Sequence, residues 1–147
     1  MNNIILSLKP RYAQAILCGR KRYEFRRSIF KKPNVKTAYI YVTSPIGKIV
    51  GAFTIGRILT GTPKEIWAKC RKYAGITCEE FFKYYEGCRR AFAIQIQSVQ
   101  NFLKPLDPYL KTPNFTPPQS FYYLENDILR QVAGRTLKLT PACASWV

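Results

Sequence analysis

The chain has 147 residues, 47% of them hydrophobic and 14% aromatic, which excludes a disordered protein and predicts one folded domain over residues 1–147. Its 24 lysines and arginines outnumber 8 acidic residues, and the resulting charge of +16 makes nucleic acid the first partner to consider. The sequence contains no histidine, which excludes histidine-dependent catalytic triads and the common zinc sites that use histidine.

The positive charge is concentrated in the first half of the sequence. Residues 1–64 contain 13 basic residues and one acid, whereas residues 65–147 contain 11 basic residues and seven acids. This distribution favours a nucleic-acid-binding face, although a general contribution to solubility explains it too. Five cysteines without CxxC spacing predict free thiols rather than a disulfide framework. We expect neither a metal nor a cofactor.

No apolar run reaches the about 18 residues that cross a membrane, and the N-terminal stretch lacks the pattern of a signal peptide. We therefore expect a cytoplasmic protein without a membrane span. The sequence predicts no particular oligomeric state.

A strand and a helix are predicted at the start of the chain. Residues 3–8 are mostly apolar and predict a short buried strand. Pro10 suits the first turn of a helix that runs to Cys18, and Gly19 suits its C-terminal end. Alternation then predicts a half-buried strand over residues 22–26, with aromatic side chains on one face and charged side chains on the other.

Two strands and two helices are predicted next. Residues 37–43 are β-branched and aromatic, and residues 48–60 form a long strand pattern that contains two glycines, Gly51 and Gly56. Interior glycines of this kind often mark bulges or bends, as in small barrels. Thr62 and Thr77 each begin a segment with the capping chemistry of a helix.

The last third of the chain predicts one strand and a long loop. Residues 90–99 alternate and predict a strand, whereas residues 102–118 contain five prolines and predict a surface loop. Residues 119–124 predict a strand or a turn, and residues 125–133 predict a short C-terminal helical extension. Together these elements predict an α+β fold, a small mixed β-barrel with helices at its rim.

The densest basic run extends from Gly19 to Arg27, with five basic residues around Glu24. This run either lines an anion-binding pocket or forms a solvated strand edge. On a flat strand Lys21 and Glu24 face opposite sides, so they share a pocket only if the chain bends after Gly19. If they meet, we expect Glu24 to keep Lys21 charged, which suits phosphate binding and opposes a nucleophilic role. The alternative is a surface ion pair worth at most about 1 kcal/mol.

The spacing Gly19-x-Lys21-x-x-Glu24-x-Arg26, after a strand and a helix, resembles the GxKxxExR signature of the ASCH domain. This family belongs to the PUA-like superfamily of small β-barrels. Three further segments resemble members of the family: residues 41–45, residues 49–58 and residues 117–121. The resemblance covers residues 3–100 well and the end of the chain loosely.

The resemblance implies a pocket, lined by the signature residues, that binds RNA or a nucleobase. Some relatives are proposed regulators of translation or transcription, and another has been described as a ribonuclease. One branch hydrolyses N4-acetylcytidine with a lysine, a threonine and a glutamate. Lys21 matches that lysine, but Glu24 stands in place of the threonine, and residues 72–76 contain no acid where the glutamate is expected.

Our main hypothesis is therefore a nucleic-acid-binding protein, with RNA favoured, whose basic pocket holds a nucleotide or a base. The alternative is a hydrolase, acting on a modified nucleoside or as a ribonuclease, in which Glu24 positions water or acts as a base and Lys21 stabilises negative charge. A third hypothesis is a protein-interaction module. The residues expected to bind nucleic acid are Lys9, Lys21, Arg22, Glu24, Arg26, Thr43, Ser44, Gln119 and Tyr122.

Overall fold

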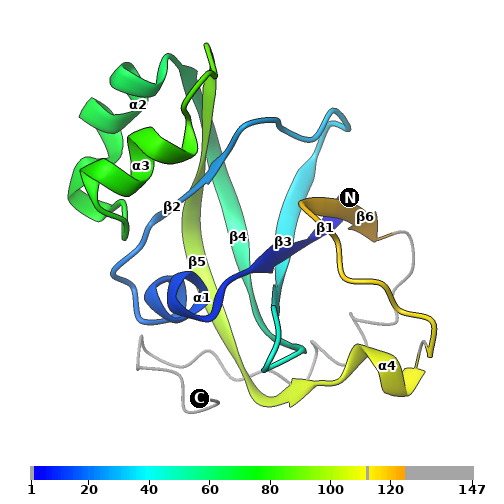
Figure 1. Ribbon diagram of the computed structural model, residues 1–147. Coiled ribbons are helices and arrows are strands. Elements are labelled where there is room, and N and C mark those ends of the chain that lie inside the picture. The colour runs from blue at the N-terminus through cyan, green and yellow to red at the C-terminus, as the bar shows by residue number, and fades with distance from the viewer. Residues whose placement is uncertain (1, 112, 125–147) are drawn as a thin grey trace.

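The computed structural model describes residues 2–111 and 113–124 of the chain. These residues form one six-stranded sheet, with helices against it and at one end of its longest strands (Figure 1). The elements in chain order are β1 (Asn2–Leu8), α1 (Pro10–Leu17), β2 (Tyr23–Arg26), β3 (Val35–Val42), β4 (Lys48–Gly61), α2 (Pro63–Cys70), a 3-10 turn (Arg71–Tyr73), α3 (Cys78–Tyr84), β5 (Ala91–Leu106), α4 (Pro108–Lys111) and β6 (Phe121–Leu124).

The sheet has the strand order β2-β5-β4-β3-β1-β6. β1 and β3 run parallel, and every other neighbouring pair is antiparallel. Within the described part of the chain, β2 pairs only with β5 and β6 pairs only with β1. The α+β class is confirmed, but the prediction of a closed barrel is wrong, because the two short outer strands do not pair with each other and leave the sheet open.

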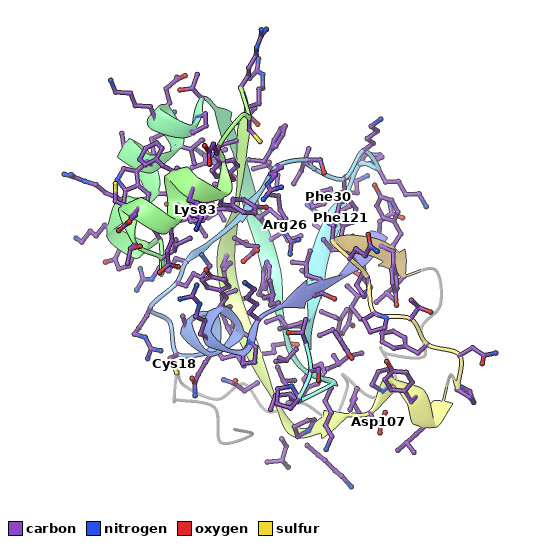
Figure 2. The ribbon with its side chains drawn as sticks, viewed as in Figure 1. Cys18, Arg26, Phe30, Lys83, Asp107 and Phe121 are labelled. Carbon is purple, nitrogen blue, oxygen red and sulfur yellow. The ribbon has the colours of Figure 1, made fainter. Side chains whose placement is uncertain are left out.

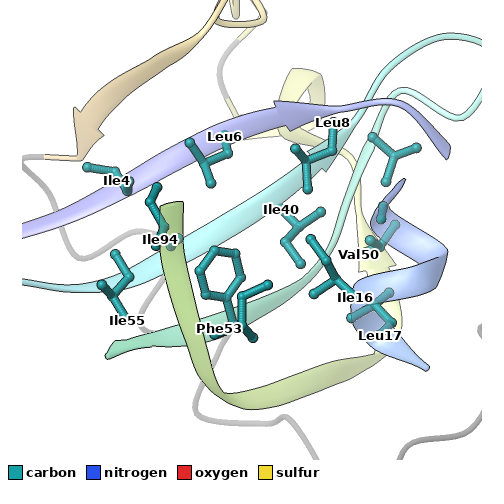
Figure 3. Close-up of a cluster of buried hydrophobic side chains, with 14 of the residues drawn as sticks. Ile4, Leu6, Leu8, Ile16, Leu17, Ile40, Val50, Phe53, Ile55 and Ile94 are labelled. Carbon is teal, nitrogen blue, oxygen red and sulfur yellow. The ribbon is translucent and has the colours of Figure 1, made fainter. Parts of the chain in front are cut away.

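The main core forms where β1 packs between two layers of side chains. Successive residues of a strand point to opposite faces, so Ile4 and Leu6 join one cluster whereas Ile5 joins another. Figure 3 shows Ile16 and Leu17 of α1 packing into the first of these clusters. Burying each of these large side chains stabilises the fold by about 1.5–3 kcal/mol. Burial on both faces explains why β1 reads as a nearly continuous apolar run.

A second core joins α2 and α3 to β2 and β5. Phe81 of α3 is fully buried, and its ring lies 5.0 Å from that of Phe25 and 4.9 Å from that of Trp67. Both helices begin at the predicted caps, because the side chains of Thr62 and Thr77 accept hydrogen bonds from the third residue of each helix. The short strand β2 is therefore covered by these helices and is not a solvated edge (Figure 1).

The long strands β4 and β5 depart from regular pairing near Gly51 and Gly56, as predicted. The register of β4 against β5 shifts between Ile49 and Gly51 and again around Gly56. β5 continues to Leu106, and α4 follows, so the predicted loop over residues 102–118 is wrong for its first half. Pro105 fits this strand because it lies near the strand's end.

Two further expectations concern the C-terminal helical extension and a membrane span. The predicted helical extension at residues 125–133 lies outside the described residues. Among residues 2–111 and 113–124, no helix is long and apolar enough to span a membrane.

Candidate functional site

A pocket of about 900 Å³ lies at the opening that the unclosed sheet leaves beside β2. Its walls come from β1, the start of α1, β2, α3 and the segment that precedes β6. Figure 2 shows Arg26 on β2 between α3, which carries Lys83, and β6, which carries Phe121. Elements far apart in the sequence therefore meet around one cavity.

Lys21 reaches this pocket because the chain turns sharply after α1. Gly19 has a φ of 81°, a left-handed conformation that favours glycine, and the amide groups of Arg20 and Lys21 both donate to the Ala15 carbonyl at 3.0 Å. Lys21 therefore precedes β2 rather than lying within it. The predicted bend occurs, and Lys21 and Glu24 line the same pocket.

The Lys21 side chain is buried, with 3% of the residue exposed. Its Nζ donates a hydrogen bond to the Ala74 carbonyl oxygen at 2.6 Å and lies 4.6 Å from the centre of the Phe25 ring. Burial lowers the pKa of Lys21 from its ordinary value of 10.5 to about 8, although the Glu24 carboxylate raises it. Glu24 thus acts in the expected direction, toward the charged form of Lys21, but desolvation has the larger effect on the pKa.

Gly75 allows Lys21 to lie in this position. A Cβ atom at residue 75 would lie 2.5 Å from the Cβ and 2.7 Å from the Cγ of Lys21, closer than side chains pack. Gly75 also has a φ of +65°, which disfavours other residues. The turn between α2 and α3 thus packs directly on the aliphatic part of the lysine.

Glu24 and Arg26 form a buried ion pair on β2. They are 7% and 8% exposed, and Arg26 Nη2 lies 3.4 Å from Glu24 Oε1. Tyr85 holds this strand in place, because its hydroxyl donates to the Arg26 carbonyl oxygen at 2.9 Å. The alternative of a solvated strand edge is therefore wrong for Glu24 and Arg26, and burial of Lys21 and Glu24 also contradicts a surface ion pair between those two.

The guanidinium of Arg26 has donors that the protein does not use. Its Nη1 donates to Ser120 Oγ at 3.3 Å and so links β2 to the segment before β6. Its Nε and Nη2 are buried but make no hydrogen bond with the described residues, since the Glu24 contact lacks hydrogen-bond geometry. The Ser7 Oγ, on the same pocket wall, is buried and unbonded as well. Buried donors without partners are costly, so this group favours an anion that accepts from them.

The rim of the pocket is basic and aromatic. Arg11 binds Glu80, with Nη2 2.8 Å from Oε2, and the Tyr12 hydroxyl donates to the same oxygen at 3.2 Å. Arg27 lies over the Tyr84 ring, with its guanidinium carbon 4.4 Å from the ring centre. Three further polar residues from separate elements complete the lining: Lys9, Lys83 and Gln119.

The structure divides the predicted binding residues into three groups. Those that line this pocket are Lys9, Lys21, Glu24, Arg26 and Gln119. Arg22 points to a neighbouring pocket on the other side of Lys21. Thr43, Ser44 and Tyr122 line neither pocket, and the Tyr122 hydroxyl instead donates to the Thr116 carbonyl oxygen at 3.0 Å. Thr43 and Ser44 follow the end of β3, and Tyr122 lies within β6.

Several pocket residues were not predicted from the sequence. In the sequence, Glu80 fits the capping pattern of a helix and Tyr12 fits the polar face of an amphipathic helix, so neither pattern indicates a pocket. Ser120 is the exception, because it belongs to the segment 117–121 that resembles ASCH proteins. Among the residues that the structure describes, no three of Cys, Asp or Glu lie close enough together to hold a metal ion.

Comparison with known proteins identifies relatives of this chain. The family model described as "ASCH domain" matches residues 6–105. An ASCH domain-containing ribonuclease of Zymomonas mobilis is 29% identical over 135 residues, which are 90% of this chain and 90% of that protein.

Solved structures agree with this result. A tyrosine-to-phenylalanine variant of the ASCH protein from Zymomonas mobilis matches with a TM-score of 0.84 at 26% identity, over 93% of this chain and 100% of that chain. The N-terminal domain of McrB from Staphylothermus marinus matches with a TM-score of 0.60 at 10% identity, over 90% of this chain and 93% of that one. The second likeness shows a shared fold only.

Proposed function

This chain belongs to the ASCH domain family, and on that premise we propose that it is a ribonuclease that holds one RNA phosphate beside Lys21, Glu24 and Arg26. The observation that carries the proposal is the buried Arg26 guanidinium, whose Nε and Nη2 donors find no partner among the described residues. The relative from Zymomonas mobilis that is named a ribonuclease supports RNA as the substrate.

The charges around the pocket suit a phosphate diester. Arg26 presents a planar pair of donors, which matches two oxygens of a phosphate group. Lys21 adds a second buried cation, and its pKa of about 8 leaves it mostly protonated at neutral pH. Glu24 balances one of these charges, and exposed Lys83 and Arg27 at the rim attract the rest of the RNA backbone.

The same groups can promote cleavage of the bound diester. RNA supplies a 2′-hydroxyl next to each phosphate, and attack by its oxygen forms a new O–P bond while the 5′-oxygen leaves. We assign to Glu24, which lines the pocket, the role of accepting the proton of the attacking hydroxyl. Lys21 and Arg26 stabilise the negative charge that develops on the phosphate oxygens, and protonated Lys21 supplies a proton to the leaving oxygen.

Cleavage of labelled single-stranded RNA by purified protein tests the proposal. Arg26→Ala should lower kcat/KM by at least about a hundredfold, because a charged contact made in the transition state is lost. Arg26→Lys keeps the charge, loses the paired donors, and should be intermediate. The matched control is Arg90→Ala, since Arg90 is exposed and lines neither pocket.

Binding and chemistry are separated by Glu24→Gln, which removes the base and preserves the shape of the side chain. The proposal predicts that this variant binds RNA at least as tightly as the native protein and cleaves it far more slowly. If the native protein binds RNA but does not cleave it, the protein binds RNA and is not a ribonuclease. Unchanged cleavage by Arg26→Ala would show that the phosphate binds elsewhere.

Hydrolysis of N4-acetylcytidine is a second candidate function, favoured by the lowered pKa of Lys21. A lysine that loses its proton near neutral pH can act as a base or as a nucleophile. Against this activity, the group that faces Lys21 Nζ is the Ala74 carbonyl oxygen, where that branch is expected to have a carboxylate. Release of acetate from the nucleoside, abolished by Lys21→Arg, would establish it.

A further inference from the structure

A second pocket, of about 560 Å³, lies on the other side of Lys21. The C-terminal end of α1, the 3-10 turn after α2 and the middle of β5 form its walls. Of the described residues, Lys21 alone lines both this pocket and the pocket around Arg26. The two cavities therefore adjoin each other at Lys21.

The two pockets have different chemistry. The pocket around Arg26 contains two carboxylates and several cations, whereas none of the described residues that line the second pocket is acidic. Gln95, Gln97 and Asn101 contribute neutral amides to the second pocket. Amide groups both donate and accept hydrogen bonds in one plane, as the edge of a nucleobase does.

Tyr73 and Arg22 line the same pocket. The guanidinium carbon of Arg22 lies 4.1 Å from the centre of the Tyr73 ring, so the two groups form one flat stack. The backbone of Arg22 fixes this stack, because its N–H donates to the Tyr73 carbonyl and its carbonyl accepts from the Ile96 N–H, both at 2.9 Å. Such a surface stacks well with a base.

The orientation of one amide is set by the fold. Gln95 Oε1 accepts a hydrogen bond from the backbone N–H of Arg57 at 3.0 Å, at the irregular part of β4. Its NH₂ group has no hydrogen-bond partner among the described residues and is left for a ligand. Gln97, two residues further along the same face of β5, is exposed, and its amide has no such partner in the described part of the chain either.

We propose that this second pocket binds the nucleobase adjacent to the phosphate held by Arg26, and so gives the protein a base preference. The inference rests on the proposed function, because it places the RNA backbone at Lys21 and Arg26. Stacking on Tyr73 and Arg22 supplies affinity for any base. The amides of Gln95 and Gln97 distinguish one base from another by hydrogen bonds to its edge.

A set of short RNAs with each of the four bases beside a single cleavable linkage tests this inference. The native protein should favour one base by about tenfold in kcat/KM, the discrimination that a good pair of hydrogen bonds provides. Gln97→Ala should reduce this ratio to about twofold. Gln100→Ala is the matched control, because Gln100 lies on the same strand and lines neither pocket.

Binding of the four nucleoside monophosphates, followed by fluorescence or NMR titration, separates failure of this inference from failure of the proposed function. If no RNA is cleaved, the ribonuclease proposal fails, but a base preference in binding that Gln97→Ala removes still supports the second pocket. Tyr73→Ala, checked for folding by circular dichroism, should weaken binding of all four bases. Equal binding and cleavage of the four bases, or a preference that survives Gln97→Ala, would overturn the inference.

Discussion

At Lys21, burial lowers the pKa and the Glu24 carboxylate raises it, and burial has the larger effect. The nearby Arg26 acts in the same direction as burial. The lysine therefore changes its charge near pH 8, within the range in which most assays are run. A phosphate site that depends on this cation must weaken as the proton is lost.

The pH dependence of RNA cleavage tests this role of Lys21. Below a pH of about 8 the side chain is charged and binds phosphate, and above it the charge is lost, so kcat/KM should fall as pH rises through that value. Lys21→Arg should lack this falling limb, because arginine stays protonated. A kcat/KM that rises through pH 8 and depends on Lys21 would instead show that the neutral lysine acts as a base.

Gly75 is a second residue whose role is visible in the structure. Gly75→Ala should lower the free energy of unfolding by roughly 2–4 kcal/mol, because the new methyl group meets the Lys21 side chain and the left-handed backbone disfavours alanine. Gly87→Ala is the matched control, since Gly87 has a φ of +80° but nothing within 4 Å of the added atom. Gly87→Ala should lower the free energy of unfolding by about 1–2 kcal/mol, because only the left-handed backbone disfavours alanine there. Equal losses in urea unfolding would show that residue 75 does not press on Lys21.

At the scale of elements, the short strand β2 depends on its neighbours for its position. It has four residues, pairs with β5 alone among the described strands, and carries Glu24 and Arg26. α3 supports it through Phe81, which packs on Phe25, and through the Tyr85 hydroxyl, which bonds the carbonyl oxygens of Arg26 and Phe92. The helices that follow β4 therefore position the candidate site, although they contribute few of its charged groups.

Removal of the Tyr85 hydroxyl tests this support. Tyr85→Phe leaves the carbonyl of Arg26 without its buried donor and should destabilise the protein by about 1–3 kcal/mol in urea unfolding. It should also weaken phosphate-dependent RNA binding, because β2 is less firmly held. Tyr23→Phe is a control on the same strand, since the Tyr23 hydroxyl makes no hydrogen bond with the described residues. A Tyr85→Phe protein as stable as the native one would contradict this role.

At the scale of the whole molecule, basic residues gather at the opening of the unclosed sheet. The edges at β2 and β6 do not pair, and Arg26 and Ser120 connect them through side chains instead. The pocket opens at this place, and basic residues from α1, β2 and α3 surround it. The positive charge around this opening suits the RNA binding that we propose.

Salt dependence of RNA binding tests this charged surface. Each phosphate contact contributes about −0.7 to the slope of log affinity against log salt for single strands. Lys83→Ala and Arg27→Ala, at the rim of the pocket, should each make the slope shallower by roughly this amount. Lys64→Ala, an exposed residue of α2 that lines neither pocket, should leave the slope unchanged. A flat salt response in the native protein would exclude this electrostatic binding.

Local signals in the sequence were enough to predict most of the elements. The proline and glycine that bound α1, the threonines that cap α2 and α3, and the β-branched residues of β3 act over a few residues, so no knowledge of distant partners is needed. The spacing of Gly19, Lys21, Glu24 and Arg26 likewise identified the family and the centre of the candidate site.

Only the tertiary structure decided what surrounds that basic run. Whether β2 meets β6 depends on contacts between residues almost a hundred positions apart, and local patterns carry no information about them. The same contacts bury Glu24 and Arg26, bring Ala74 and Gly75 onto Lys21, and place Ser7 and Ser120 on the wall of the pocket. The sequence determines the charges of the run, whereas the lowered pKa of Lys21 and the unbonded donors of Arg26 follow from burial, which the fold alone sets.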